Sequence, residues 1–174
     1  MSYEPKSTDA QQRLFWDHKE ISDRLGTWCR CVDTRNLDPM AEVFDAAVVW
    51  DFGKGTVDHG LERIIQRIKA HMFGAAFCGA RQIHIANLRV EVEGDDAQSE
   101  AYFFAASAGV REYAGRTLLE WGNYHDIWAR RANGWRIVKR NYRMDIQEGP
   151  LEILYGTASA DMWEPGDARR LDHT

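Results

Sequence analysis

The side chain with the clearest potential for chemistry is His84, which lies in a predicted strand over residues 81–93. Side chains alternate between the two faces of a strand. Simple alternation puts Ile83 and Ile85 on one face, and the opposite face then carries His84, Ala86, Leu88, Val90 and Val92. The second set is apolar apart from the imidazole, so we expect His84 to face the core. There it would be either a hydrogen-bonded structural residue or a proton acceptor near neutral pH.

The second candidate is Asp33, at the end of a predicted helix over residues 8–33. A carboxylate opposes the helix dipole at a C-terminus, so a cation, a histidine or water has to compensate it. One interpretation is a solvated acid or a cap for the next segment. In the other, Asp33 meets His84 in the interior, orients the imidazole and stabilises its protonated form. Such a pair is a general base that needs no metal.

The last predicted strand, residues 134–146, is rich in cations, with Lys139, Arg140 and Arg143 distributed over both of its faces. An arginine that pointed inward would need an anion, either a carboxylate or an oxyanion that forms on a substrate. The alternative is a solvated edge strand whose charges oppose aggregation. Four tyrosines are possible phenol donors, and the sequence alone does not choose among Tyr102, Tyr113, Tyr124 and Tyr142.

Several common sites are missing from the sequence. There is no glycine-rich phosphate loop, no helical His-x-x-x-His pair and no serine nucleophile elbow. The three cysteines are Cys29, Cys31 and Cys78. The odd count argues against a disulfide scaffold, and residues two apart on a helix point in divergent directions. We therefore expect buried free thiols and no metal site at these cysteines.

Composition narrows the class of protein. The chain has 174 residues with a formal net charge of −5, which argues against nucleic acid as the main partner. The length fits one main domain, and no apolar run is long enough to span a membrane. The polar N-terminal segment carries both charges and does not resemble a targeting signal. A cytoplasmic location is the expectation.

Periodicity predicts the elements that must position these residues. Apolar residues recur at helical spacing over residues 8–33 and 60–72, and Asp38-Pro39 opens a short helix between them. Residues 46–52 form a predicted strand. After Gly79 the period changes to two, which predicts long strands over residues 81–93, 97–108, 116–131 and 134–146. This order indicates an α+β fold in which a curved antiparallel sheet packs on three N-terminal helices as a cone.

The segments that carry Asp33, His84 and Arg140 resemble the SnoaL-like branch of the NTF2-like superfamily. The similarity extends over roughly residues 12–147 and runs through Ile21-Ser-Asp-Arg-Leu, Cys-Val-Asp33, Ile83-His84-Ile-Ala-Asn-Leu and Tyr124-His-Asp-Ile-Trp through Lys-Arg-Asn141. The pattern is most similar to the hexachlorocyclohexane dehydrochlorinase, bile-acid dehydratase and scytalone dehydratase group. The resemblance implies a cone-shaped domain, a site without cofactor and a His–Asp base formed by His84 and Asp33. Arg140 matches an arginine that assists the leaving group.

One position departs from that group, which has a lysine or tyrosine five residues before the aspartate. Here the residue is Trp28, whose indole offers a single N–H donor. Another residue would then have to protonate the leaving group. We expect the substrate pocket to be lined by Trp28, Trp50, Tyr102, Tyr124 and Leu88. Residues 1–147 form the expected domain, and residues 148–174 form an extension that covers the cone or a neighbouring subunit.

The function implied is a cofactor-independent lyase, a dehydratase or another β-eliminating enzyme, that acts on a hydrophobic cyclic or aromatic small molecule. Two alternatives stay open: an isomerase, cyclase or hydrolase with the same pocket, and a non-catalytic protein such as the small subunit of an aromatic-ring dioxygenase. By resemblance we also expect a homo-oligomer, either a trimer or a dimer, that associates through the exposed face of the sheet.

Overall fold

A long helix and a twisted sheet dominate the computed structural model, which describes residues 8–53, 55–70 and 77–156. Helix α1 (Thr8–Thr34) is followed by the short helix α2 (Met40–Val43) and by strands β1 (Phe44–Asp51) and β2 (Val57–His59). Helix α3 (Leu61–Lys69) comes next. The long strands are β3 (Cys78–Glu93), β4 (Asp96–Gly109), β5 (Thr117–Arg131) and β6 (Gly134–Glu148), and α4 (Glu152–Tyr155) follows them.

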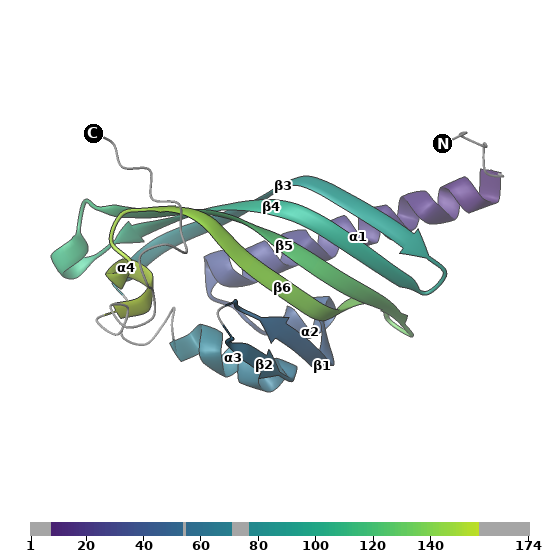
Figure 1. Cartoon of the computed structure of the whole chain (residues 1–174), viewed down its shortest axis with the longest axis horizontal. Helices are drawn as coiled ribbons and strands as arrows, with labels where there is room; N and C mark the ends of the chain where they lie inside the picture. Colours follow the sequence, from purple (N-terminus) through teal and green to yellow (C-terminus); the bar gives the residue numbers. More distant parts are fainter. Residues whose placement is uncertain (1–7, 54, 71–76, 157–174) are drawn as a thin grey trace.

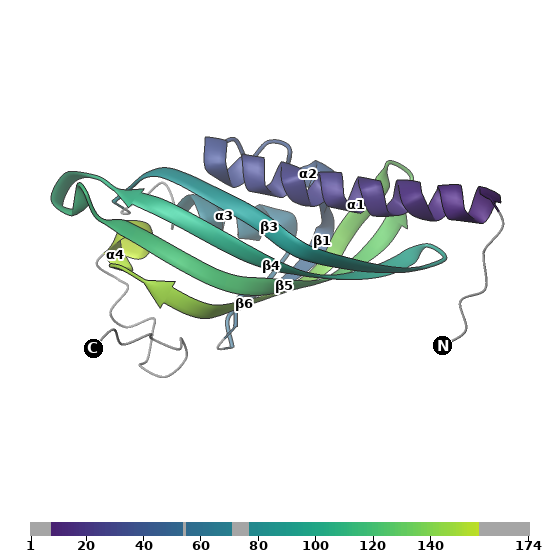
Figure 2. The same cartoon turned by 90° about the horizontal axis from the view of Figure 1, so that it is seen from above.

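The six strands form one curved, unclosed sheet in the order β2-β1-β6-β5-β4-β3. Strands β3 to β6 form an antiparallel meander, whereas β1 pairs with β6 in parallel. Figure 1 shows the long strands twisting together, with α2, α3, β1 and β2 grouped at one side. Figure 2 shows α1 lying along one face of the meander. We call this the inner face and the opposite one the outer face.

Most predicted elements are present, and the α+β class is confirmed. Helix α1 begins at the expected residue, Thr8, and its apolar stripe, Ile21, Leu25, Trp28 and Val32, is buried. Three features were not expected: strand β2, which pairs with β1 as an edge hairpin, the parallel pairing of β1 with β6, and helix α4. Strand β2 has only three residues, which is too short for an alternating pattern to be recognised in the sequence. The predicted ends at residues 71–72 and 157–174 lie outside the described residues.

One core cluster lies between α1 and the inner face, and a smaller cluster lies at the end of the sheet near α4. There Ile153 and Leu154 pack against Cys78 and Leu118. Residues 151–156 therefore cover one end of the sheet. Within the described ranges, no helix has the length and apolarity that crossing a membrane requires.

Strand β3 contains an irregularity that changes which side chains face inward. The pairing of β3 with β4 shifts between Ala86 and Arg89, and Asn87 has a left-handed φ of 52°. Before this bulge the more buried side chains have odd numbers, Arg81, Ile83 and Ile85; after it they have even numbers, Leu88, Val90 and Val92. A bulge inserts one extra residue into a strand. The two apolar sets of β3 therefore share one face.

Candidate functional site

Asp33 lies on the last turn of α1, at a point where the helix is fastened to the start of β3. Arg35 ends the helix with a φ of 58°. Its guanidinium donates hydrogen bonds of 2.6 Å to the carbonyl oxygens of Cys78 and Gly79. This connection brings the Asp33 carboxylate to the backbone of β3, where Oδ1 accepts a hydrogen bond from the N–H of Ile83 at 2.9 Å.

The Asp33 carboxylate is only half-buried, and burial raises its pKa above the ordinary value. The Ile83 N–H and the more distant charges of Arg81 and His84 lower the pKa in part. Among the described residues, no cation bonds directly to this carboxylate, and Oδ2 has no hydrogen-bond partner. Asp33 is thus a carboxylate with one oxygen held and one free, and its affinity for a proton is increased.

His84 does not face the core, so the predicted face is wrong. Its side chain is exposed on the outer face, where the imidazole stacks on Phe104 with 6.1 Å between ring centroids. The physical reason is the bulge at Asn87, whose extra residue places His84 and Leu88 on opposite faces of the sheet. Ile83 occupies the inward position beside Asp33 and is buried. The structure does not bring His84 and Asp33 together as a dyad.

Arg140 does point into the core, and Asp126 is the anion that accompanies it. The guanidinium donates from Nε and Nη2 to the two carboxylate oxygens at 2.7 and 2.6 Å, and both side chains are fully buried. Burial raises the pKa of Asp126, whereas the charge of Arg140 and its hydrogen bonds lower it. In the described part of the chain, the third nitrogen, Nη1, has no hydrogen-bond partner.

Aromatic rings surround Arg140. Its Cζ lies 4.1 Å from the ring centroid of Tyr124 and 5.1–5.5 Å from those of Trp28, Phe44 and Trp50. The indole N–H of Trp50 is buried and has no acceptor within the described residues, whereas that of Trp28 faces the Tyr124 hydroxyl and lowers its pKa in part. Buried donors normally have partners. Arg140 Nη1 and the Trp50 indole therefore leave two unused donors in one aromatic region of the interior.

A second buried ion pair, Arg81–Glu120, lies toward the α4 end of the inner face. Arg81 Nη1 donates to Glu120 Oε2 at 2.9 Å and to Ser107 Oγ at 2.6 Å. Burial lowers the pKa of Arg81, but the charge of Glu120, the nearby Tyr155 and Tyr142 and the hydrogen bond to Glu120 together outweigh this, and the net pKa is raised. Tyr155 of α4 donates to Glu120 Oε1 at 3.5 Å. Arg81 is two residues from Ile83 on the same face, so it belongs to the surroundings of Asp33.

An aromatic layer separates the two ion pairs. Phe103 stacks on Tyr124 and on Tyr142, with 4.9 and 5.3 Å between centroids. Gly122 makes this arrangement possible, because a Cβ there would lie 2.6 Å from the Phe103 ring. Burial raises the pKa of Tyr124 to about 12 and that of Tyr142 well above its usual value. Both phenols are therefore protonated donors at neutral pH.

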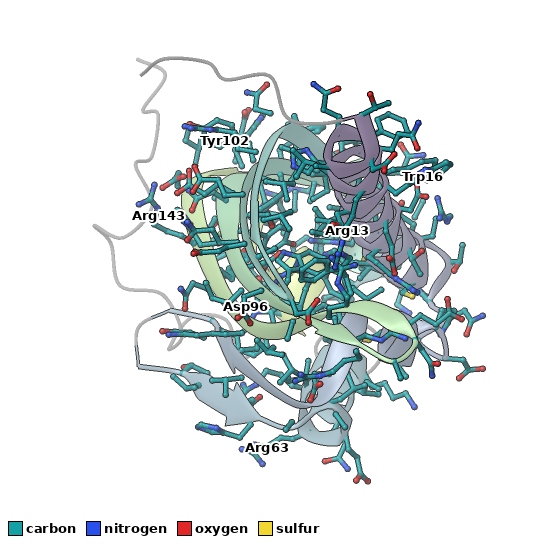
Figure 3. All side chains as sticks on the ribbon, turned by 90° about the vertical axis from the view of Figure 1, so that its right-hand side faces the viewer. Arg13, Trp16, Arg63, Asp96, Tyr102 and Arg143 are labelled. Atoms are coloured by element: carbon teal, nitrogen blue, oxygen red, sulfur yellow. The ribbon has the colours of Figure 1, made fainter. Side chains whose placement is uncertain are left out.

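Two predicted lining residues lie elsewhere. Tyr102 is 57% exposed, and Figure 3 shows it with Arg143 on the side of the sheet away from α1. Tyr102 is therefore wrong as a lining residue, because its neighbour Phe103 takes the inward position on β4. Leu88 is half-buried and lines an open groove between β3 and the first half of α1, with Phe15 and His18 among its neighbours. Trp28, Trp50 and Tyr124 are all buried in the main core cluster.

The cysteines and acidic groups give no sign of a metal centre. No cluster of three His, Cys, Asp or Glu side chains that could hold an ion occurs within residues 8–53, 55–70 and 77–156. All three cysteines are free and buried. Burial raises the pKa of Cys29 to about 11, so its thiol stays protonated and is a poor nucleophile.

Sequence reasoning missed the pair Arg81–Glu120, although a signal for it exists. Glu120 shares its inward phase on β5 with the buried residues Leu118, Tyr124, Asp126 and Trp128. A carboxylate that faces the interior needs a buried cation beside it. The bulge also has a signal, because asparagine is unfavourable within strands and the apolar phase changes on either side of Asn87.

The family model for the SnoaL-like domain matches residues 13–141. The chain belongs to the SnoaL-like domain family. No curated protein matches it. Since the matched segment includes Asp33, β3 and Arg140, the candidate site lies within the family domain.

Several solved structures share this fold, among them a protein of the NTF2-like superfamily. A proposed scytalone dehydratase from Novosphingobium aromaticivorans is 12% identical with a TM-score of 0.71, covering 80% of this chain and 91% of that one. A hexachlorocyclohexane dehydrochlorinase is 16% identical with a TM-score of 0.64, covering 90% and 97%. An NTF2-like superfamily protein from Salmonella enterica is 20% identical with a TM-score of 0.62, covering 76% and 89%. At these identities the similarity establishes the fold alone.

Proposed function

We propose that this SnoaL-like protein is a cofactor-independent enzyme of the lyase or isomerase type that acts on a hydrophobic cyclic or aromatic small molecule. Asp33 alone is its general base. The observation that carries the proposal is the state of this carboxylate, which is held by the Ile83 N–H, has one free oxygen and has a raised pKa. Scytalone dehydratase and the dehydrochlorinase, whose folds it shares, are named for eliminations.

The chemistry follows from a carboxylate placed against an apolar interior. Asp33 Oδ2 takes a proton from a carbon of the substrate, and the electrons of the broken C–H bond form a carbon–carbon double bond as a β-substituent leaves with its bonding pair, which is an elimination. If the substrate instead has a neighbouring double bond and no leaving group, that double bond shifts by one position and the proton returns to a different carbon, which gives an isomer. A raised pKa brings the base closer to the pH at which it works and so improves proton transfer.

The walls of the interior select the substrate. Phe103, Tyr124 and Tyr142 supply stacked ring faces, and Trp28 and Trp50 add two indoles. Such surfaces bind flat apolar rings by dispersion and the hydrophobic effect. In the proposed mechanism, Arg140 Nη1 and the Trp50 indole bind the departing group, since both are buried donors without acceptors beside these rings. Arg140 acts through hydrogen bonding rather than net charge, because Asp126 neutralises it.

The test is an assay with a β-hydroxytetralone, whose dehydration gives a naphthol that absorbs strongly, together with deuterium exchange into α-tetralone followed by NMR. The Asp33→Asn variant should lose about 10²–10⁴-fold in rate, the usual contribution of a general base. The matched control is His84→Gln, which should keep the wild-type rate. Equal rates for wild type and Asp33→Asn would refute Asp33 as the base. Absence of turnover and of exchange in the wild-type protein would refute the proposed reaction class.

The outward position of His84 favours one other candidate, a non-catalytic small subunit of an aromatic-ring dioxygenase. A scaffold subunit needs no base inside its cone. Purification of the chain from its own cells as a stoichiometric complex with a larger iron–sulfur protein would support this interpretation. A homogeneous protein that contains no second chain and binds α-tetralone would contradict it.

A further inference from the structure

The buried ion pair Arg81–Glu120 has no role in the proposed proton transfer. The Arg81 side chain is 10% exposed, and that of Glu120 is 1% exposed. Removing two charges from water is costly, and well-packed apolar residues would often replace such a pair without loss of stability. Core packing alone therefore gives little reason for this pair, and its position beside Asp33 suggests a purpose in binding.

The Arg81 guanidinium is only partly satisfied. Within residues 8–53, 55–70 and 77–156, its hydrogen bonds come from Nη1 alone, to Ser107 and Glu120. Nε is buried and has no acceptor there. A buried N–H without an acceptor costs about 1–3 kcal/mol. The two bonds from Nη1 fix the plane of the guanidinium, so the unused donor has a defined direction.

The charges around Arg81 indicate which acceptor fits. Glu120 already neutralises Arg81, and an ionised Asp33 adds a negative charge on the same face. An anionic ligand such as a carboxylate would be repelled by Asp33 and would find no net positive charge. A neutral acceptor, such as the carbonyl oxygen of a ketone, satisfies the donor without this electrostatic penalty.

We propose that Arg81 binds and polarises the carbonyl oxygen of a cyclic ketone substrate whose ring lies on the aromatic layer of Phe103, Tyr124 and Tyr142. This proposal rests on the proposed function, because it names the residue that binds the polar end of the same substrate. When Asp33 removes the proton from the carbon next to the carbonyl, the C–H electrons form the enolate double bond. The carbonyl π electrons move to oxygen, and Arg81 donates its hydrogen bond to the resulting oxyanion.

Helix α4 completes this arrangement. Tyr155 donates to the second carboxylate oxygen of Glu120, and Ile153 and Leu154 pack on Cys78 and Leu118 at that end of the sheet. Glu120 is therefore held from two sides, by Arg81 and by α4. Glu120 and Tyr155 are positioning residues, since they fix the direction of the Arg81 donor without contacting the ketone.

The test compares three ligands of similar shape: tetralin, α-tetralone and a tetralin carboxylate. Affinities come from quenching of tryptophan fluorescence and from calorimetry. Wild-type protein should bind α-tetralone about tenfold more tightly than tetralin, as expected for one buried donor that gains its acceptor. The carboxylate should bind more weakly than the ketone. Equal affinities for tetralin and α-tetralone, or tighter binding of the carboxylate, would overturn the proposal.

The deciding variant is Arg81→Lys, which keeps a cation beside Glu120 but removes the guanidinium Nε donor. It should lose the preference for the ketone and keep the affinity for tetralin. The matched control on the same strand is the exposed Arg89→Lys, which should preserve the preference. Arg140→Lys tests the competing donors. If that variant loses the preference while Arg81→Lys keeps it, the carbonyl binds beside Arg140 and the proposal is wrong.

A second readout is independent of whether a variant folds. The carbonyl carbon of ¹³C-labelled α-tetralone should shift downfield on binding to wild-type protein, because a hydrogen bond polarises the C=O group. An unchanged shift for the bound ketone would contradict the proposal.

Asp33→Asn separates the two hypotheses: it should abolish deuterium exchange and leave the ketone preference intact. If exchange is absent in wild type while the preference persists, the reaction class fails and the Arg81 site stands.

Discussion

The side chains of Asp33 and His84 lie on opposite faces of strand β3. The carboxylate of Asp33 accepts the backbone N–H of Ile83 on the inner face, while the next residue, His84, lies on the outer face against Phe104. Alternation along β3 puts Ile83 and His84 on opposite faces. If Asp33 is the base, as proposed, it works without an imidazole, and its raised pKa favours proton transfer to it.

Replacing His84 tests this separation directly. Since the imidazole is exposed, His84→Gln should change the free energy of unfolding by no more than about 0.5 kcal/mol, the range of most surface substitutions. Urea denaturation measures this value. In the tetralone assay, the pH–rate profile of His84→Gln should superimpose on that of the wild type. A profile that differs from that of the wild type would show that the imidazole takes part.

The bulge at Asn87 can be tested by changing its residue type. Its φ of 52° is left-handed, a conformation that glycine and asparagine adopt more readily than β-branched residues. Asn87→Gly should therefore stay within about 0.5 kcal/mol of the wild type, whereas Asn87→Val should lose about 1–2 kcal/mol. Thermal and urea unfolding provide the comparison. Equal stability of the two variants would argue against the left-handed bulge.

The raised pKa of Asp33 makes stability depend on pH with a defined sign. The folded protein binds this proton more tightly than the unfolded chain, whose aspartate titrates near 3.8. The contribution of Asp33 therefore favours folding below that value and is lost as the pH rises through the higher folded value. The amide introduced by Asp33→Asn does not titrate, so this variant should gain stability relative to wild type as the pH rises from the acidic range to neutrality.

Urea denaturation of both proteins across this range checks the prediction. A difference in unfolding free energy that stays constant with pH would contradict the raised pKa. Glu62→Gln, at an exposed residue of α3, is a suitable control for the loss of one surface carboxylate.

The buried pair Arg140–Asp126 should be essential for stability. Asp126→Asn leaves a buried guanidinium without its counter-charge, and breaking such pairs costs about 3–5 kcal/mol. The exposed pair Lys19–Asp23 on α1 is the matched control, and Asp23→Asn should cost less than about 1 kcal/mol. Urea denaturation of the two variants measures both values. Similar losses would mean that burial does not set the strength of the Arg140 pair.

The sequence by itself determines the order of the elements and most of their ends. The apolar stripe of α1 and the long alternating segments need only local spacing, because helix and strand periods differ so clearly. It also singles out Asp33 and the cation-rich last strand, whereas the burial of Arg140 between Trp28, Phe44 and Trp50 comes from the structure.

Tertiary structure decides which partners meet. Asn87 inserts one extra residue, and this reverses the face on which His84 lies relative to Leu88. Arg81 and Glu120 are 39 residues apart and meet only because β3, β4 and β5 lie side by side with a particular register. Alternation fixes a side chain's face only while a strand is regular. Where a bulge interrupts it, pairing with the neighbouring strand sets which residues share the interior.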